Sequence, residues 1–252
     1  MVTRRYGRTV VIVETNAPAS SRPVVTVDIY SDVVCPWCYI GKRKFETGLG
    51  LVAADDLGVD FDVTYRPYQL DPSAAPGTSE PVLDAYAKKF GGAERAKAII
   101  DNVSDRAADV GLEFNMDRAL RANTLLAHRL IWFAGEHDAE PNAGVEQAAM
   151  KERLLKAYFT DGLDIGDPEV LADCASELGI DRQVALDFLA SDRGRAEVAA
   201  ELDEARDEGI TAVPTYVFNG KWAVPGAQEP ETFAQVLRKM ASDAMSSVPA
   251  DR

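Results

Sequence analysis

The stretch from Val24 to Leu49, VVTVDIYSDVVCPWCYIGKRKFETGL, decides the fold of this 252-residue chain. Its first part, Val24 to Tyr30, is rich in β-branched and aromatic residues and carries a single charge. This composition predicts a strand in a sheet that is covered on both faces. Ser31 and Asp32 end the apolar run, so a turn is expected before the Cys-Pro-Trp-Cys sequence.

A helix is predicted to begin directly after this turn. Pro36 fits the first turn of a helix, because the N–H group that it lacks has no partner there. Apolar or small residues then recur three and four positions apart, at Cys38, Gly41, Phe45 and Leu49. This spacing puts Cys38 on the covered face of the helix and Cys35 at its exposed start. Since residues three apart on a helix are neighbours, the two sulfurs are expected within reach of each other.

We interpret the two cysteines as a redox-active dithiol. A helix N-terminus presents unpaired N–H groups and partial positive charge, which stabilise a thiolate. The pKa of Cys35 is therefore expected to fall from about 8.5 into the range of roughly 3.5–7.5. Cys35 is then the nucleophile that forms a mixed disulfide, and Cys38 is the thiol that resolves it.

The composition limits the partners and the location of the protein. The chain has 27 basic and 41 acidic residues, a net charge of −14, which argues against nucleic acids and anionic membranes as partners. No apolar run approaches the roughly 20 residues of a membrane span. The longest near the N-terminus, Val10 to Val13, is shorter than the roughly 7–15 apolar residues of a secretory signal. We therefore expect a cytoplasmic protein whose residues 1–22 form an irregular tail.

The remaining elements follow the order βαβ, a helical block, then ββα. Residues 59–68 alternate apolar and polar side chains and predict a second strand, parallel to the first. From residue 80 to about 207 only helical patterns occur. Strands are predicted again at 215–218 and 221–224, joined by an Asn219-Gly220 hairpin turn, and a closing helix at 229–244. Residues 23–78 and 208–245 are therefore expected to build one sheet domain, with residues 79–207 as an inserted helical domain.

Four stretches resemble the DsbA-type thioredoxin-fold oxidoreductases, most closely their FrnE-like branch. They are DIYSDVVCPWCYIGK at 28–42, AHRL at 127–130, residues 155–179 and GITAVPTYVFNGK at 209–221. The resemblance covers about residues 24–240 and implies an α/β thioredoxin fold with a large helical insertion. It also implies a cis peptide bond between Val213 and Pro214, facing the dithiol, and a Val213 backbone that pairs with an extended substrate.

The chain departs from this family at two places. Related oxidoreductases often have a buried proton-relaying acid six residues before the first cysteine, where this chain has Ile29, so no proton acceptor for Cys38 is evident. Some FrnE-like proteins carry a further cysteine pair, of which only Cys174 is present, and it falls on an apolar stripe typical of an inert buried thiol. We interpret His128 as a structural histidine with a hydrogen bond.

The other residues near the cysteines have simpler interpretations. Trp37 lies between the cysteines and is expected to tune the reduction potential of the pair and to contact substrate. Pro36 is expected to shape the backbone of the site. Lys42, Arg43 and Lys44 are expected to form a solvated helix face. Zinc needs four ligands, and no cysteine or histidine has a finger-like spacing from the pair, so no metal is expected.

The sequence thus predicts a thiol–disulfide oxidoreductase that acts on protein or small-molecule thiols and disulfides. No cofactor is expected, although glutathione stays open as a cosubstrate. The sequence does not determine the oligomeric state, and a homodimer is one of the options. One alternative is a glutathione-dependent isomerase or transferase of the kappa-class or hydroxychromene-carboxylate isomerase type. Such proteins typically have serine at the position of Cys35. The other alternative is a non-catalytic, chaperone-like binding module.

Overall fold

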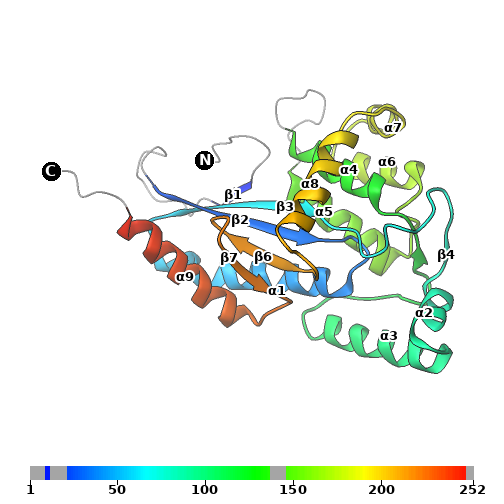
Figure 1. Ribbon diagram of the computed structural model, residues 1–252, viewed down its shortest axis with the longest axis horizontal. Helices are drawn as coiled ribbons and strands as arrows, with labels where there is room; N and C mark the ends of the chain where they lie inside the picture. Colours follow the sequence, from blue (N-terminus) through cyan, green and yellow to red (C-terminus); the bar gives the residue numbers. More distant parts are fainter. Residues whose placement is uncertain (1–8, 12–21, 137–145, 248–252) are drawn as a thin grey trace.

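A five-stranded sheet forms the centre of the computed structural model, which describes residues 9–11, 22–136 and 146–247 (Figure 1). The strand order is β1-β3-β2-β6-β7. The strands are β1 (Thr9–Val11), β2 (Val24–Ser31), β3 (Asp60–Pro67), β6 (Thr215–Phe218) and β7 (Trp222–Pro225). β2 and β3 are parallel, as predicted for the strands on either side of a helix, and the other neighbours are antiparallel. The strands that precede the inserted helices in the sequence and the strands that follow them therefore form one sheet.

One face of the sheet is covered by the helices α1 (Pro36–Val52) and α9 (Pro230–Ser246), which lie side by side in Figure 1. Val25, Val27 and Ile29 alternate along β2 and pack on this face with side chains of both helices. On the opposite face Thr26 and Asp28 are only half-buried, and Asp28 accepts a hydrogen bond from Arg66. The prediction that β2 is covered on both faces is therefore right for one face and only partly right for the other.

The hairpin between β6 and β7 has the turn that its sequence predicts. Asn219 and Gly220 both have positive φ angles, 52° and 62°, as the two-residue turn of a tight hairpin requires. The side chain of Asn219 also accepts a hydrogen bond from the backbone N–H of Thr26, at 3.0 Å. The turn thereby ties the hairpin to β2.

The inserted block is helical, as predicted, apart from one small sheet. Its elements are α2 (Val82–Phe90), α3 (Ala93–Ala108), α4 (Leu125–Gly135), α5 (Gln147–Lys156), a π-helical turn (Ala157–Asp161), α6 (Pro168–Glu177), α7 (Arg182–Ala190) and α8 (Arg195–Asp207). The absence of strands predicted for this block is wrong at β4 (Glu80–Pro81) and β5 (Leu120–Arg121), which pair with each other. Strands of two residues are too short to show an alternating pattern in the sequence.

The irregular tail predicted for residues 1–22 is wrong at Thr9–Val11. These residues form β1, which pairs antiparallel with Phe61 to Val63 of β3 and extends the edge of the sheet. Their apolar run was too short to indicate more than an isolated segment, because an edge strand gains its stability from the partner strand. Residues 1–8 and 12–21 lie outside the described part of the chain.

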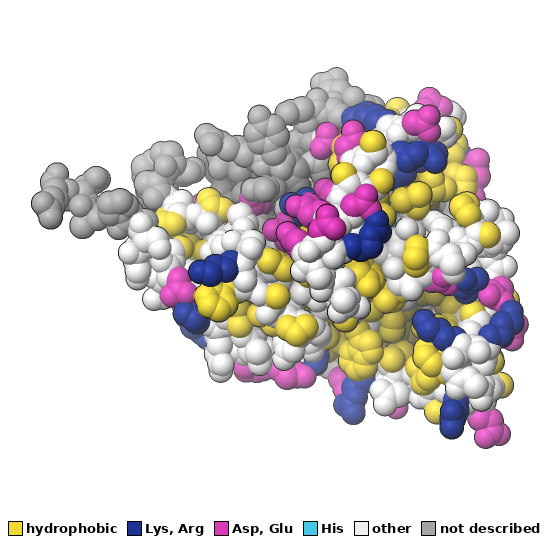
Figure 2. Space-filling view, viewed as in Figure 1, with side chains coloured by type: hydrophobic (Ala, Val, Ile, Leu, Met, Phe, Trp, Pro, Cys, Tyr) yellow, Lys and Arg dark blue, Asp and Glu magenta, His cyan; other side chains and the backbone are white. Residues whose placement is uncertain are grey.

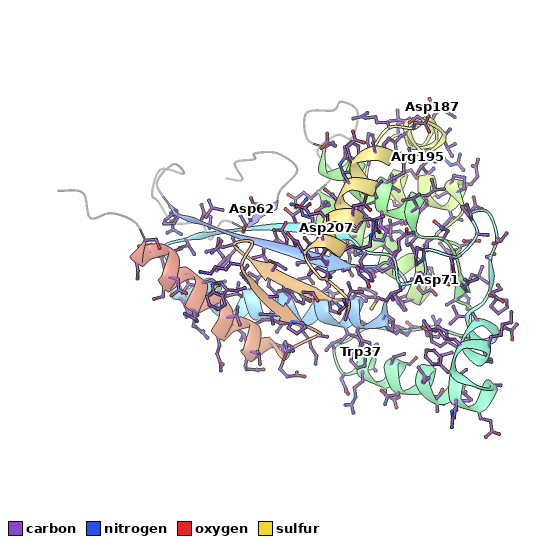
Figure 3. The ribbon with its side chains drawn as sticks, viewed as in Figure 1. Trp37, Asp62, Asp71, Asp187, Arg195 and Asp207 are labelled. Atoms are coloured by element: carbon purple, nitrogen blue, oxygen red, sulfur yellow. The ribbon has the colours of Figure 1, made fainter. Side chains whose placement is uncertain are left out.

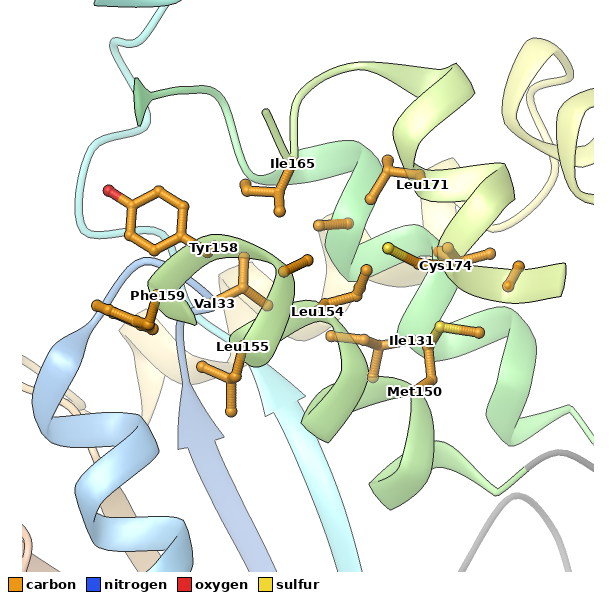
Figure 4. Packing of buried hydrophobic residues seen from close by; sticks show 14 of the residues in the cluster. Val33, Ile131, Met150, Leu154, Leu155, Tyr158, Phe159, Ile165, Leu171 and Cys174 are labelled. Carbon is orange, nitrogen blue, oxygen red and sulfur yellow. The ribbon is translucent and has the colours of Figure 1, made fainter. Parts of the chain in front are cut away.

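The hydrophobic core of the insertion extends into the loop that carries the cysteines. Val33 is fully buried among Leu154, Leu155 and Phe159 of the inserted helices (Figure 4). Tyr39 and Ile40 of α1 belong to the same cluster. The cysteine turn therefore lies where the sheet and the inserted helices pack against each other. That the chain divides into two domains near residues 78 and 207 stays a prediction.

Candidate active site at the Cys-Pro-Trp-Cys turn

Helix α1 begins at the first cysteine. Cys35 is the N-cap residue with φ −90° and ψ 113°, and Pro36 occupies the first helical position. The N–H groups of Cys38 and Tyr39 donate to the carbonyl oxygen of Cys35, at 3.0 and 3.4 Å. The predicted helix start is confirmed, and it places the Cys35 side chain where the free N–H groups of the first turn converge.

Both cysteines are free thiols and both are buried. Cys35 is 4% exposed and Cys38 is 3% exposed. Beyond the effect of burial, Cys35 raises the pKa of the Cys38 thiol, which places the two cysteine side chains next to each other. The prediction that Cys35 lies at an exposed helix start is wrong. Other parts of the fold cover this helix end, which the sequence of the helix itself cannot reveal.

One of these parts is the loop before β6. The peptide bond between Val213 and Pro214 is cis, as the family resemblance implied. The Cys35 thiol donates to the carbonyl oxygen of Val213, with a sulfur–oxygen distance of 3.6 Å. Gly41 lets α1 pass close to this loop, because a Cβ atom at Gly41 would lie 3.0 Å from Cγ of Pro214 and 2.7 Å from the hydroxyl oxygen of Tyr216.

Cys38 faces a buried polar cluster under the helix start. Burial raises the pKa of Cys38 well above its usual value, and the neighbouring Cys35 adds to the rise. The positive charge of Lys151 and the backbone N–H of Asp32 oppose this increase. Lys151 lies on α5, is 1% exposed, and donates to the carbonyl oxygen of Ser31 at 3.4 Å. The insertion thus brings a buried cation close to Cys38.

The Asp32 carboxylate in this cluster has its acceptor sites occupied. Oδ1 accepts from the N–H of Val33 at 2.8 Å, and Oδ2 accepts from the N–H of Leu70 at 2.8 Å. Nε2 of His128 lies 3.1 Å from Oδ1 and 3.0 Å from the carbonyl oxygen of Tyr68. Because both neighbours are acceptors, Nε2 carries the hydrogen, and burial lowers the His128 pKa and favours the neutral ring. His128 is the hydrogen-bonded structural residue that was predicted.

Three side chains of α1 fix the position of α5 through Glu152. Lys42 lies 2.6 Å, Arg43 2.7 Å and the Tyr39 hydroxyl 2.8 Å from the Glu152 carboxylate oxygens. Lys42 is only 4% exposed and Lys44 pairs with Glu229, so the solvated basic face predicted for residues 42–44 is wrong. These contacts hold Lys151, the residue before Glu152, against the cysteine turn.

A groove of about 430 Å³ lies beside the cysteine turn, between the insertion and the loop that follows β3. Apolar side chains line most of it, with charged residues at its rim: Val34, Leu70, Val82, Tyr86, Ala122 and Tyr158, then Lys88, Lys89 and Arg121 with Asp71 and Glu80. In Figure 2 hydrophobic side chains gather in a hollow next to α2, with basic side chains at its edge. Burial raises the pKa of Tyr86 to about 12, and the nearby Cys35 adds to the rise.

Trp37 is the exposed member of the cysteine turn. Its side chain is 41% exposed, and Figure 3 shows it at the end of α1 beside the inserted helices. Cys174, in contrast, is fully buried in the insertion, and burial raises its pKa to about 11. The third thiol therefore lies away from the surface, as predicted.

The part of the chain that the structure describes contains no group of three or more His, Cys, Asp or Glu side chains placed to hold a metal ion. No described helix combines the length and the apolar character needed to cross a bilayer.

The fold and the cysteine site have known counterparts. The model of the DSBA-like thioredoxin domain matches residues 26–238. The chain belongs to this family. A solved structure, described as a probable DsbA oxidoreductase from Streptomyces coelicolor, is 30% identical with a TM-score of 0.76, covering 90% of this chain and 93% of that one. This membership supports a thiol–disulfide oxidoreductase or a related isomerase, and it confirms the thioredoxin fold with its helical insertion.

Two further proteins are similar to this member of the DSBA-like family. The uncharacterized protein YwbO of Bacillus subtilis is 29% identical over 215 residues, which are 84% of this chain and 96% of YwbO. The cytosolic disulfide reductase DsbM of Pseudomonas aeruginosa, solved with GSH, has a TM-score of 0.58 at 19% identity, covering 86% of this chain and 99% of that one. At that identity the likeness to DsbM concerns the fold alone.

Among the site residues, the structure brings Cys35, Cys38, Val213 and Pro214 together. Sequence reasoning missed Lys151, Glu152 and Tyr86, which all come from the insertion. One signal for Lys151 was available, because it falls three and four positions before Leu154 and Leu155 on the apolar stripe of its helix. A charged residue on such a stripe is either paired or functional.

Proposed function

We propose that this protein is a thiol–disulfide oxidoreductase with Cys35 as nucleophile and Cys38 as resolving thiol. The observation that carries the proposal is the pair of neighbouring free thiols at the N-terminus of α1, against the loop of Val213 and Pro214. Cys35 is the N-cap residue of this helix, a position with unpaired N–H groups and partial positive charge that suits a nucleophilic sulfur. Cys38 stays protonated until it attacks the mixed disulfide, because burial raises its pKa.

The reaction is a pair of thiol–disulfide exchanges. The Cys35 thiolate attacks one sulfur of a substrate disulfide, and the other substrate sulfur leaves as a thiolate. Cys38 then loses its proton and attacks the Cys35 sulfur of the mixed disulfide. The second substrate thiolate leaves, and the Cys35–Cys38 disulfide remains. Two electrons pass from the cysteine pair to the substrate. The same steps in reverse oxidise a substrate dithiol, and the potential of the pair relative to its compartment sets the direction.

We also propose where the substrate binds. The backbone of Val213 pairs with an extended substrate segment, and Trp37 contacts the substrate from the solvent side. The groove beside α2 takes the adjoining apolar part of the substrate, since it opens next to Val34 and Tyr86. Glutathione is a candidate cosubstrate, in line with the DsbM structure that was solved with GSH, and a cytoplasmic location fits the same neighbour.

The intact cysteine pair favours this function over a glutathione-dependent isomerase. An isomerase of that type uses glutathione as a cosubstrate and has no need of a resolving thiol. In this chain the second thiol is held against the first, and its pKa is raised by that contact. Such an arrangement serves the closure of a disulfide ring.

The test is to trap the mixed disulfide. The Cys38→Ser variant should accumulate a glutathione adduct on Cys35 when mixed with oxidised glutathione, as read by mass spectrometry. The wild type should pass to the Cys35–Cys38 disulfide, and Cys35→Ser should form no adduct. Cys174→Ser should behave as the wild type because Cys174 is fully buried. Failure of Cys38→Ser to form the adduct with oxidised glutathione or with an aromatic disulfide would refute the proposal.

A further inference from the structure

Lys151 is a buried ionisable group that the mechanism above leaves without a role. Its side chain is 1% exposed, yet within the described residues its one hydrogen bond is the long contact to Ser31, at 3.4 Å. A buried ammonium group has three N–H donors and is costly to hold without partners. The neighbouring positions of α5 explain why it stays there. Gln147 exchanges two hydrogen bonds with the backbone of Tyr65 in β3, and Glu152 binds α1.

We propose that Lys151 is the proton-exchange group for Cys38, taking its proton when Cys38 attacks the mixed disulfide and returning it in the reverse reaction. This inference rests on the proposed function and names the acceptor that the family's usual position lacks, since that position is Ile29. Ile29 is buried on the α1 side of the sheet, among apolar residues.

The other ionisable groups of the cluster are poorly placed for this task. The Asp32 carboxylate is held by the N–H groups of Val33, Leu70 and His128. His128 contacts Asp32 rather than a cysteine, and its Nε2 hydrogen is shared between two fixed acceptors. Lys42 is paired with Glu46 and Glu152. Lys151 has only the long contact to Ser31 among the described residues, so the nitrogen lone pair of its neutral amine is available to a proton.

The step balances without any further reactant. The neutral amine of Lys151 accepts the proton of Cys38. The Cys38 thiolate forms a bond to the Cys35 sulfur, and the bond between Cys35 and the substrate sulfur breaks. The substrate leaves as a thiolate with the electron pair of that bond. In reverse, a substrate thiolate attacks Cys35, Cys38 leaves as a thiolate, and the Lys151 ammonium protonates it.

The charges around Lys151 agree with a group that changes its protonation near neutral pH. Burial lowers its pKa to about 8, against the opposing effects of Cys38 and Cys35 on α1 and of Asp32 after β2. Lys42, also on α1, lowers it further by repulsion. From α4, neutral His128 adds no charge. Both forms of Lys151 are therefore populated where thiol exchange takes place.

A small pocket lies against Lys151, among β3, α4, α5 and α8. Its lining includes Lys151, Gln147 and His128 together with Arg66 and Glu201. The side chains of Arg66 and Glu201 are 22% and 23% exposed. Burial raises the Glu201 pKa, so this carboxylate can take up protons more readily than a solvated one. Lys151 thus shares this pocket with two partly exposed charged side chains, through which we expect its proton to exchange with solvent.

The experiment isolates the resolving step. In a Cys174→Ala background, 5,5′-dithiobis(2-nitrobenzoate) forms an aromatic mixed disulfide on Cys35, and the attack of Cys38 releases a second aromatic thiolate that is followed by absorbance. That leaving group is a stable anion, so the rate reports the deprotonation of Cys38. In the wild type the rate should rise with pH and level off near pH 8 or below. In Lys151→Met it should be about 100-fold slower at pH 7.5, the scale of general base catalysis, and keep rising into alkaline solution.

Two further variants control the result. Lys42→Met removes a neighbouring buried cation but leaves the proposed acceptor. It should keep a plateau, displaced to higher pH because Lys42 lowers the Lys151 pKa. Lys151→Arg keeps a positive charge that cannot be lost, and it should lack the plateau. Equal rates and pH profiles in Lys151→Met and the wild type would overturn the proposal. First-phase labelling of Cys35 shows that each variant is folded and that the proposed oxidoreductase chemistry is intact, so the two hypotheses fail separately.

Discussion

At the scale of single residues, the site combines a thiol that is hard to ionise with a lysine that is hard to keep charged. Cys38 and Lys151 are both shielded from solvent, and each shifts the pKa of the other toward the ionised form. An apolar residue at position 151 would cost less to bury. A charge at this position is understandable if it takes part in the chemistry. The role of Lys151 is therefore tested by the stability of the protein as well as by the rate of the resolving step.

Removing this buried charge is expected to stabilise the protein in a pH-dependent way. The Lys151 pKa is lowered from 10.5 to about 8, so the folded state binds fewer protons than the unfolded state between these values. The lysine therefore destabilises the fold fully below pH 8, and this effect fades as the pH rises to 10.5. We expect Lys151→Met to unfold at higher urea concentration at pH 7, with a gain of about 3 kcal/mol. The gain should shrink toward pH 10. A gain that is equal at both pH values would contradict the assigned titration.

At the scale of secondary-structure elements, buried side chains of the insertion cap the ends of neighbouring elements. The clearest case is Arg129 of α4, which is fully buried. Its guanidinium donates to the carbonyl oxygens at the end of α7 and in the turn that follows, those of Phe188, Leu189, Ser191 and Arg193. The last turn of a helix leaves such carbonyl oxygens without hydrogen-bond donors inside the helix. The Arg129 side chain supplies these donors, as the backbone N–H groups of a glycine C-cap do in other helices.

Arg129→Met is therefore expected to lower the free energy of unfolding by about 3 kcal/mol, because several buried carbonyl groups lose their donors at once. Arg182→Met is the matched control. Arg182 is on the exposed surface of α7 and pairs with Asp173 and Glu169, so its loss should change stability by less than about 1 kcal/mol. Urea unfolding followed by circular dichroism measures both. Equal effects of the two substitutions would show that the buried contacts contribute little.

The elements also show what the sequence could and could not predict. Helices and strands of seven or more residues have a period that is visible in the chain, and the Asn219-Gly220 turn has its own chemistry. β1, β4 and β5 were missed because two or three residues carry no period and depend on a partner strand. The burial of Cys35 and Lys42 was missed for a related reason. Each becomes buried only when another helix or loop packs over it.

At the scale of the whole molecule, the dithiol lies in a core shared by the sheet domain and the insertion. Val33 and Ile40 from the cysteine segment are fully buried in the same cluster as Leu130 of α4 and Leu155 of α5. Glu152 links α5 to α1 through three side chains. Since the resolving thiol, its proposed proton acceptor and the groove wall come from both parts, the site exists only when both are folded.

The shared core predicts that the two parts unfold together. A variant that keeps Trp37 as its single tryptophan, with Trp132 and Trp222 changed to phenylalanine, reports on the cysteine turn. Far-ultraviolet circular dichroism of the same variant reports mainly on the inserted helices, which hold most of the described helical residues. Because exposing Val33 and Ile40 would strip apolar surface from both parts, the fluorescence and dichroism curves in urea should share one midpoint. A variant that keeps only Trp132, which stacks on Phe188 in the insertion, should give the same agreement. A Trp37 transition that comes clearly before the loss of helix would show that the sheet domain opens by itself, and the active site would then be able to disassemble without unfolding the insertion.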